Sequence, residues 1–347
     1  MKPKLYIHIG FPKCGSTTLQ NFLVQAQGKL RNHGMVVVDQ NMNHPGNTRA
    51  KRVAQYSLWK MLDSPGAPKE IAESLTKIAI AMKKHNTKAA VFSGEQLGNQ
   101  AEYAEFFRPA LALFDVKVIA YVRPQETWLP SAWKQFGVRE GKSLETHLDS
   151  APRARVPGFL RKLKAWGSVF GKENIYVNTL ARGNLYQSDL IADFCKALDL
   201  PDSFAPNNRP KNSTNVTFDN HILMVLLSAP KLLEGGGTGS IYGFLDKYLP
   251  KPAFESGRNA VSHEKALQIR EEFREENEAI VAEFMPGSTY QEAFETQKPL
   301  KPMDVSSDLL TANAKTTAYL IAIAEKQSRE IETLRKQLKR LEAKLED

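Results

Sequence analysis

Two glycines, Gly10 and Gly15, enclose a short stretch that follows an apolar segment near the start of the chain. Glycine lets a backbone turn tightly and point its N–H groups at one anion. A helix that begins after such a turn adds the positive end of its dipole. The next residues carry hydroxyls that can donate further hydrogen bonds: Ser16, Thr17 and Thr18. The stretch therefore predicts a loop that binds phosphate or a similar anion.

The lysine of this loop is not where a nucleoside triphosphate loop has it. The glycine spacing matches G-x-x-x-x-G-K-[ST], but Ser16 stands in the lysine position and Lys13 lies inside the loop. We also see no clear aspartate at a strand end that could help to hold Mg²⁺. Both features argue against a Mg²⁺-bound triphosphate. A P-loop nucleotide kinase is kept as an alternative, which a Mg²⁺-dependent ATP titration would reveal.

Cys14 lies in the same loop, at a predicted helix N-terminus, where a thiolate would suit a phosphatase. That chemistry needs an arginine that closes the loop, and Gln20 stands at the position where we look for it. We therefore interpret Cys14 as a small residue that lines the anion site, and not as a nucleophile.

A second stretch with chemical potential is "YVRPQETWLPSAW". Arg123 ends an apolar run that reads as a strand, and Ser131 follows eight residues later at the start of a predicted helix. A guanidinium and a hydroxyl at this separation can meet a second phosphate, because guanidinium groups form paired, charge-assisted hydrogen bonds with phosphate oxygens. The alternative for Arg123 alone is a solvated ion pair.

The elements that must position these residues follow an alternating pattern. Short apolar runs rich in β-branched residues predict five strands, and helical patterns lie between them. The runs are residues 5–10, 35–39, 89–94, 116–122 and 174–180. This alternation predicts an α/β fold with a P-loop-like parallel sheet flanked by helices. Ligands of such sheets bind at the carboxyl ends of the strands. The loops after Ile9, Phe92 and Val122 should therefore meet at one site.

With these residues in view, the chain resembles the bacterial, carbohydrate-type sulfotransferases that use 3′-phosphoadenosine 5′-phosphosulfate (PAPS). "PKCGSTTLQ" is similar to their 5′-phosphosulfate loop, usually Pro-Lys-x-Gly-Thr-Thr, with Ser16 for the first threonine. "YVRPQETWLPSAW" resembles their 3′-phosphate motif, with Arg123 and Ser131 at the family spacing. "REEFREENEAIVAEFMPG" is similar to the terminal helix of bacterial members. The resemblance covers roughly residues 4–290.

The resemblance implies transfer of a sulfuryl group from PAPS to a hydroxyl or amine of an acceptor, a glycan or glycolipid, without a metal ion. Lys13 would help the phosphate to leave. "NNRPKNSTN" resembles the late loop that closes over the nucleotide, although the usual glycine after a basic pair is missing. The implied donor-binding residues are Lys13, Cys14, Gly15, Ser16, Thr17, Thr18, Arg123, Ser131, Arg209, Lys211 and Asn212.

The acceptor must lose a proton to a base. Glu95 follows the strand "AAVFSG" at the same edge of the predicted sheet, and the carbohydrate-type enzymes resemble this chain in using a glutamate. Glu95 is therefore our predicted catalytic base, together with Lys13 as the catalytic cation. His8 is the rival, but it lies inside a predicted strand, where a hydrogen-bonded core histidine is the more common role.

The C-terminal part of the chain has a different pattern. Residues 262–285 predict one long helix with Ser262 as its N-cap, which Pro286-Gly287 would end. We predict a catalytic domain at 1–298, a proline-bearing linker at 299–312 and a coiled-coil helix at 313–347. Its seam would join subunits into a homo-oligomer. The seam consists of Leu320, Ile331, Leu334, Leu338, Leu341 and Leu345. A glycine-rich stretch at 235–239 predicts a mobile loop.

Composition limits the function classes. The chain has 347 residues, a net charge of +9 and only two cysteines. The charge suits an anionic ligand, but the aromatic residues are not interleaved with basic ones in a nucleic-acid module. No apolar run approaches the roughly 20 residues of a membrane span, so we expect a cytoplasmic protein without a transmembrane segment. A non-enzymatic coiled-coil assembly protein is the remaining alternative.

Overall fold

The computed structural model describes residues 2–39, 41–46, 56–138, 140–181, 183–208, 261–295 and 305–346. The chain divides into two compact units. The first contains Met1–Leu129, Ser150–Asn215 and Ala266–Pro299, and the second contains Pro130–Asp149, Val216–Lys265 and Leu300–Asp347. The sheet and the glycine loop belong to the first unit. The glycine-rich stretch at 235–239 lies outside the described residues.

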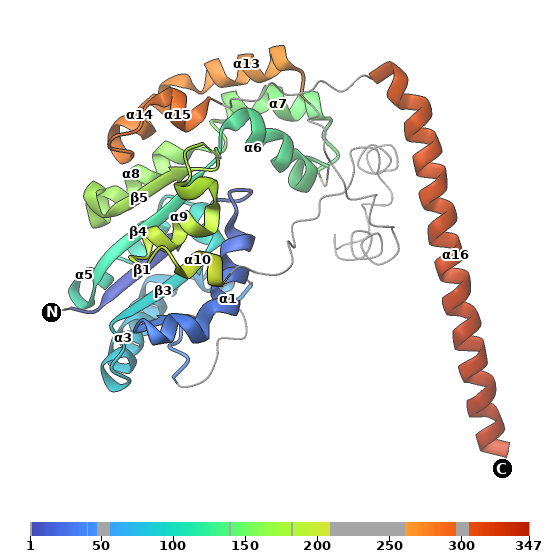
Figure 1. Ribbon diagram of the computed structural model, residues 1–347, viewed down its shortest axis with the longest axis horizontal. Coiled ribbons are helices and arrows are strands. Elements are labelled where there is room, and N and C mark those ends of the chain that lie inside the picture. Colours follow the sequence, from blue (N-terminus) through green and yellow to red (C-terminus); the bar gives the residue numbers. More distant parts are fainter. Residues whose placement is uncertain are drawn as a thin grey trace. The chain divides into compact units, whose positions relative to one another are not determined.

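The first unit is built on a five-stranded parallel sheet in the order β2-β3-β1-β4-β5 (Figure 1). The strands are β1 (Lys4–Ile9), β2 (Met35–Val37), β3 (Ala89–Gly94), β4 (Asp115–Val122) and β5 (Ile175–Thr179). Each lies within or overlaps one of the five predicted runs. The predicted α/β fold with a parallel sheet flanked by helices is confirmed.

Helices and short turns connect the strands. In the first half of the chain these are α1 (Ser16–Asn32), α2 (Tyr56–Leu62), α3 (Ala67–Lys84), η1 (Glu95–Gly98), α4 (Tyr103–Phe106), α5 (Ala110–Leu113), α6 (Gln125–Ala132), η2 (Trp133–Gly137), α7 (Leu144–Arg153) and α8 (Phe159–Phe170). They are followed by η3 (Lys172–Asn174), η4 (Tyr186–Ser188), α9 (Leu190–Ala197), α10 (Phe204–Asn207), α13 (His263–Glu272), α14 (Arg274–Phe284), α15 (Tyr290–Phe294) and α16 (Val305–Glu346).

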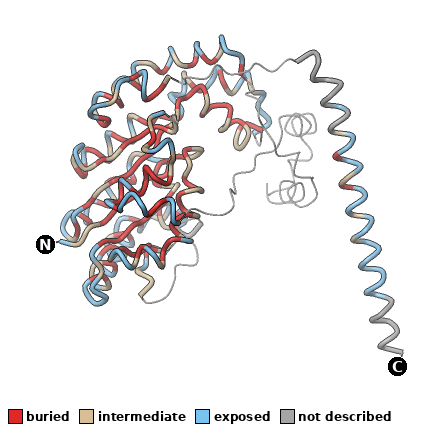
Figure 2. The backbone as a smooth tube through the Cα atoms, viewed as in Figure 1, coloured by how far each residue is buried: buried red, intermediate tan, exposed pale blue. Residues whose placement is uncertain are grey.

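The sheet is covered on both faces, as a parallel sheet requires. On one face, the ring of His8 lies 5.4 Å from the ring of Phe194 in α9, and α1 packs beside α9. On the other face, Phe92 of β3 stacks on Phe107, whose ring contacts Trp166 of α8. Figure 2 shows buried positions along the strands and on the inner sides of these helices. This core holds the carboxyl ends of the strands in place.

The carboxyl ends of three neighbouring strands meet at the glycine loop. β1 is central, and Ile9 pairs with Gly94 of β3 on one side and with Ala120 of β4 on the other. Glu95, which directly follows β3, therefore lies on one side of the loop. Arg123, which directly follows β4, lies on the other side of the loop. Both residues belong to the first unit, as does the loop.

The predicted helix over residues 262–285 is wrong in one respect, because the structure divides it. The backbone leaves helical geometry at Phe273 (φ −105°, ψ 6°), so that α13 and α14 are separate helices. The side chain of Phe273 is buried, and both α13 and α14 have buried apolar residues, Ile269 in the first and Ile280 in the second. The Ser262 hydroxyl accepts a hydrogen bond from the Lys265 N–H (3.2 Å), as predicted for an N-cap.

The last helix, α16, belongs to the second unit and runs without a break over 42 residues. It begins at Val305, so the second part of the predicted linker is helical. The side chains of Leu334 and Leu338 are 63% and 57% exposed. Leu341 and Leu345, the last members of the predicted seam, lie among side chains outside the described set. None of the described helices combines the length and the apolar character that crossing a membrane requires.

We expect the exposed stripe of α16 to be covered by a second copy of the chain, because apolar seams at heptad spacing are stabilised by association. The double variant Leu334→Asp, Leu338→Asp should then lower the mass measured by light scattering by about two- or threefold. Lys336→Ala is the control, since Lys336 pairs with Glu332 on its own helix (2.9 Å). A wild-type monomer at tens of micromolar would disprove the association.

Candidate functional site

The loop between β1 and α1 has the backbone geometry of a tight anion-binding turn. Lys13 and Gly15 adopt positive φ values of 61° and 84°. Such values suit glycine and are uncommon for lysine, so the fold holds Lys13 in a sparsely populated conformation. The Ser16 hydroxyl is buried and donates to the Phe11 carbonyl at 3.1 Å. As a donor, this hydroxyl closes the loop; its predicted contact with a phosphate stays a prediction.

Two glycines allow the end of β3 to press against this loop. A Cβ atom at Gly10 would lie 2.7 Å from the Ser16 Oγ and 2.9 Å from the Glu95 Cα. A Cβ atom at Gly98, the last residue of η1, would lie 2.6 Å from the Gly10 carbonyl oxygen. Real Cβ atoms do not approach so closely, so both positions require glycine. The close packing brings the backbone of Glu95 against the loop.

Glu95 and Lys13 influence one another electrostatically. Burial raises the pKa of Glu95, and the positive charge of Lys13 opposes that rise. Burial and the charge of Arg123 lower the pKa of Lys13, and Glu95 opposes this. Within the described part of the chain, neither side chain has an ion-pair or hydrogen-bond partner. The Glu95 carboxylate and the Lys13 ammonium are thus both half-buried and affect each other's pKa without forming an ion pair.

Arg123 touches the loop itself. Its Nη1 donates to the Lys13 carbonyl at 3.3 Å, and its Nε donates to the Thr127 hydroxyl at 3.1 Å. The Trp128 indole N–H donates to the Pro12 carbonyl at 2.7 Å. Arg123, at the end of β4, and Trp128, in the first turn of α6, therefore hold the loop backbone at two adjacent carbonyls. Sequence reasoning placed Arg123 at this end of β4, but it missed Thr127 and Trp128.

For three other predicted donor-binding residues, the structure gives a position, and their contact with an anion stays a prediction. Thr17 is exposed and Thr18 is half-buried, both in the first turn of α1. Ser131 lies near the end of α6 and belongs to the second unit, whereas Arg123 belongs to the first, so their meeting at one phosphate stays a prediction. The predicted late loop lies outside the described residues: Arg209, Lys211 and Asn212.

Cys14 is fully buried in the loop, and burial raises the pKa of its thiol well above the ordinary range. Only a thiolate is a strong nucleophile, so a neutral, buried thiol does not suit phosphatase chemistry. The four charged groups whose fields reach Cys14 are Arg123, Glu95, Lys162 and Lys13. The loop thus lies among three cations and one acid, and the third cation, Lys162, was not among our predicted residues.

His8 is placed in the core and not at the site. Its side chain is fully buried, and its Nδ1 lies 2.8 Å from the Ser93 hydroxyl. Burial lowers the pKa of His8 to about 3. Its ring packs against Phe194 on the side of the sheet covered by α9. A histidine enclosed in this way cannot reach an acceptor without opening the core, which leaves Glu95 as the better candidate base.

Two contacts from the terminal helices hold the segment after Arg123. The side-chain amides of Gln125 and Asn277 donate to each other at 2.9 and 2.8 Å, and both residues are buried. Arg270 of α13 donates to the buried carboxylate of Glu126 at 3.0 Å. The partners lie 152 and 144 residues apart, so no local sequence pattern could have indicated them.

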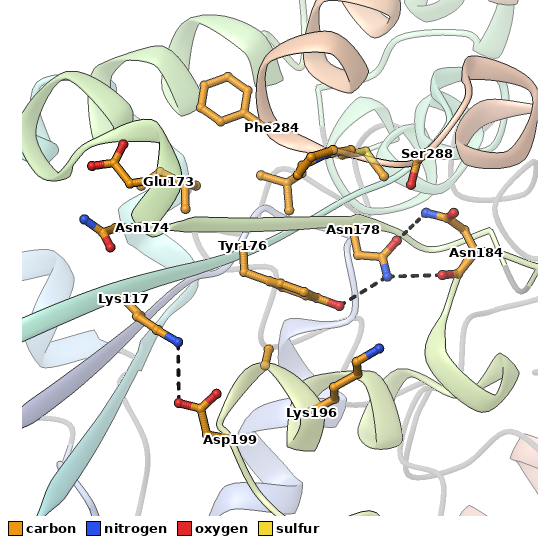
Figure 3. A pocket seen from close by; sticks show the side chains of 15 residues that line it. Lys117, Glu173, Asn174, Tyr176, Asn178, Asn184, Lys196, Asp199, Phe284 and Ser288 are labelled. Carbon is orange, nitrogen blue, oxygen red and sulfur yellow. Dashed lines mark hydrogen bonds and ion pairs between the residues drawn. The ribbon is translucent and has the colours of Figure 1, made fainter.

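A separate cavity of about 500 Å³ runs along β5 and is shown in Figure 3. None of the predicted site residues lines it. Two of its polar side chains already have protein partners, since Asn184 donates to Asn178, which in turn donates to Asp193 outside the lining (2.7 Å). Lys117 pairs with Asp199. These contacts read as structural, so we place the candidate site at the loop and not in this cavity.

No family model and no curated protein matches the sequence. Among solved structures, the chain is similar to a sulfotransferase from Alicyclobacillus acidocaldarius, with 15% identity over 62% of this chain and 87% of that one, and a TM-score of 0.34. It is also similar to the sulfotransferase domain from the curacin biosynthetic pathway, with 12% identity over 79% and 98% of the two chains and a TM-score of 0.37. At these values the likenesses establish no activity, and the function proposed below rests on the residues around the loop.

Proposed function

We propose that the chain is a sulfotransferase that uses PAPS as its sulfuryl donor. The observation that carries the proposal is the position of Lys13. It lies inside the anion loop, Arg123 donates a hydrogen bond to its carbonyl, and the charge of Glu95 raises its pKa against the effect of burial. A donor with several anionic groups needs clustered cations, and transfer to a hydroxyl needs a nearby base. This arrangement supplies both.

In the proposed reaction, an acceptor oxygen or nitrogen attacks the sulfur atom of the phosphosulfate. The bond between sulfur and the bridging oxygen breaks, and that oxygen leaves with the 5′-phosphate as part of adenosine 3′,5′-bisphosphate. Glu95 takes the proton of the acceptor, and Lys13 offsets the charge that grows on the leaving oxygen. The raised pKa of Glu95 makes it a stronger base than an exposed glutamate, although a smaller share is ionised at a given pH.

A carbohydrate hydroxyl, in a glycan or glycolipid, is the acceptor that we propose, on the strength of Glu95 and the sequence resemblance. The proposal needs no metal ion. Within the described ranges, no three His, Cys, Asp or Glu side chains are grouped to hold one; the expectation that no metal is required stays a prediction.

Isothermal calorimetry tests the donor assignment directly. The wild-type chain should bind adenosine 3′,5′-bisphosphate, and labelled PAPS should then transfer sulfate to an acceptor from a carbohydrate panel. Mg²⁺-dependent binding of ATP, with no binding of the bisphosphate, would favour the kinase alternative instead. Absence of any nucleotide binding would remove the enzymatic proposal.

Arg123→Ala should erase most of the preference for adenosine 3′,5′-bisphosphate over adenosine 5′-monophosphate. A guanidinium that bonds a phosphate contributes roughly tenfold or more in affinity, and only the bisphosphate carries the 3′-phosphate. Calorimetry with both nucleotides measures the ratio. Thr127→Val is the matched control, because it removes a protein partner of Arg123 but not the positive charge. If the preference survives in Arg123→Ala, the 3′-phosphate is read elsewhere.

A further inference from the structure

Lys162 is a cation close to the loop that the proposed reaction has not yet used. It lies in the first turns of α8, and its Nζ is 5.8 Å from the centre of the Phe11 ring. The ring of Phe159, at the start of the same helix, packs against Phe11 at 4.9 Å. α8 is therefore anchored on the loop, and the ammonium of Lys162 lies beside a loop side chain.

The ammonium of Lys162 has little to balance its charge. Its hydrogen bond goes to a neutral group, the Pro157 carbonyl at 2.9 Å, and it has no ion-pair partner among the residues that the structure describes. Glu276 is an acid whose field reaches Lys162, but its carboxylate accepts from the Leu160 N–H at 3.0 Å. Half-buried cations usually have a paired anion, since removing a charge from water without compensation is costly.

We propose that Lys162 is a further donor-binding cation, which contacts the anionic groups of PAPS together with Lys13 and Arg123. The inference rests on the proposed function. The three cations come from the loop, from the end of β4 and from α8. Arg123 donates to the Lys13 carbonyl of the loop at 3.3 Å, and the Nζ of Lys162 lies 5.8 Å from the centre of the ring of Phe11 in the same loop. A ligand with several negative charges at this loop would provide the counter-charge that Lys162 lacks within the protein.

The charge of Lys162 depends on pH in a useful range. Burial, helped by Arg161, lowers its pKa to about 8, while the acid Glu276 acts in the opposite direction. The groups that face it are thus an arginine on its own helix, a neutral thiol in the loop and one acid on α14. Lys162 is charged below about pH 8 and loses its charge above it, so its contribution to anion binding should fall as the pH rises through 8.

Calorimetry with adenosine 3′,5′-bisphosphate tests the proposal on the full chain. At about pH 7, Lys162→Ala should weaken binding by about tenfold or more, because a charged hydrogen-bond donor to phosphate is lost. Lys162→Arg should retain most of the affinity. It should also reduce the loss of affinity between about pH 7 and pH 9, since arginine does not titrate there. At about pH 7, where Lys162 is charged with or without its neighbour, Arg161→Ala removes an exposed charge from the adjacent position; it is the matched control and should bind as wild type.

The outcomes separate this inference from the function on which it rests. Equal affinity in wild type and Lys162→Ala overturns the role of Lys162 and leaves the sulfotransferase proposal intact, as does equal loss in Lys162→Ala and Arg161→Ala. If wild type does not bind the bisphosphate, the function fails, and a titration of the same variants with inorganic pyrophosphate decides whether Lys162 serves this loop for another anion. Thermal melting of each variant checks that a loss of affinity is not caused by misfolding. Lys162→Gln, which removes the charge but keeps much of the side chain, should weaken binding as Lys162→Ala does.

Discussion

Replacing Glu95 by glutamine is expected to lower the rate of sulfate transfer by about 10²–10⁴-fold while leaving donor affinity near that of wild type. Glutamine has the shape of glutamate but cannot accept the proton of the acceptor. The substitution should not disturb the loop, because the Glu95 side chain makes no hydrogen bond within the described residues and the close contact with Gly10 is made by its backbone. Single-turnover kinetics with labelled PAPS and calorimetry with the bisphosphate measure the two quantities separately.

The pH dependence of the transfer rate is a second test of the role of Glu95. Burial raises the pKa of Glu95, and a general base acts only when it is ionised. The wild-type rate should therefore rise with pH through a pKa above the ordinary glutamate range, and Glu95→Gln should lose this limb. Glu102→Gln, an exposed acid shortly after η1, is the matched control and should keep it. Full activity in Glu95→Gln would mean that the base is another group.

Lys13→Ala is the second substitution with a large expected effect, a loss in turnover of on the order of 10²-fold or more. Lys13 would stabilise charge that appears on the leaving oxygen only as the bond to sulfur breaks, so turnover should fall further than donor affinity. Both lysine and alanine must adopt the positive φ of this position, so the backbone strain is similar in the two chains. Rates at saturating donor, compared with calorimetric affinities, distinguish the two effects.

The same substitution should also move the pH profile. The charge of Lys13 opposes the burial-driven rise in the pKa of Glu95, so its removal should shift the acid limb to higher pH. Lys77→Ala, an exposed lysine on α3, should shift nothing. Near-normal turnover in Lys13→Ala would remove the residue from the chemistry, and an unmoved limb would show that its charge does not reach the base.

The strands of this fold could be predicted because each is buried on both faces and therefore reads as a continuous apolar run. The same logic placed Arg123 and Glu95 at the carboxyl ends of β4 and β3, since each directly follows a strand and parallel strands end at one edge. The loop was evident from Gly10 and Gly15, positions that only glycine can fill: Gly15 has a positive φ of 84°, and a Cβ atom at Gly10 would collide with Ser16 and Glu95. Features that depend on neighbouring residues in the chain, such as strand ends and this loop, can therefore be predicted from the sequence.

Contacts that depend on distant residues could not be predicted. Phe273, at the break between α13 and α14, has a buried side chain, and helical periodicity over the segment gives no sign of a break. The start of α16 at Val305 follows a stretch whose prolines suggested a longer linker. Lys162 was not among the predicted residues, because it comes close to the loop only through the packing of Phe159 on Phe11.

The reciprocal amide pair of Gln125 and Asn277 has a consequence for how this chain can change over generations. Each amide satisfies the other in a site closed to water, so an apolar replacement on one side strands a buried donor and acceptor at a cost of about 1–3 kcal/mol. Replacing both by apolar residues of similar size can be nearly neutral. We therefore expect substitutions at positions 125 and 277 to be tolerated only in pairs. Together with the ion pair of Arg270 and Glu126, this links the sequence of α13 and α14 to that of the segment after Arg123.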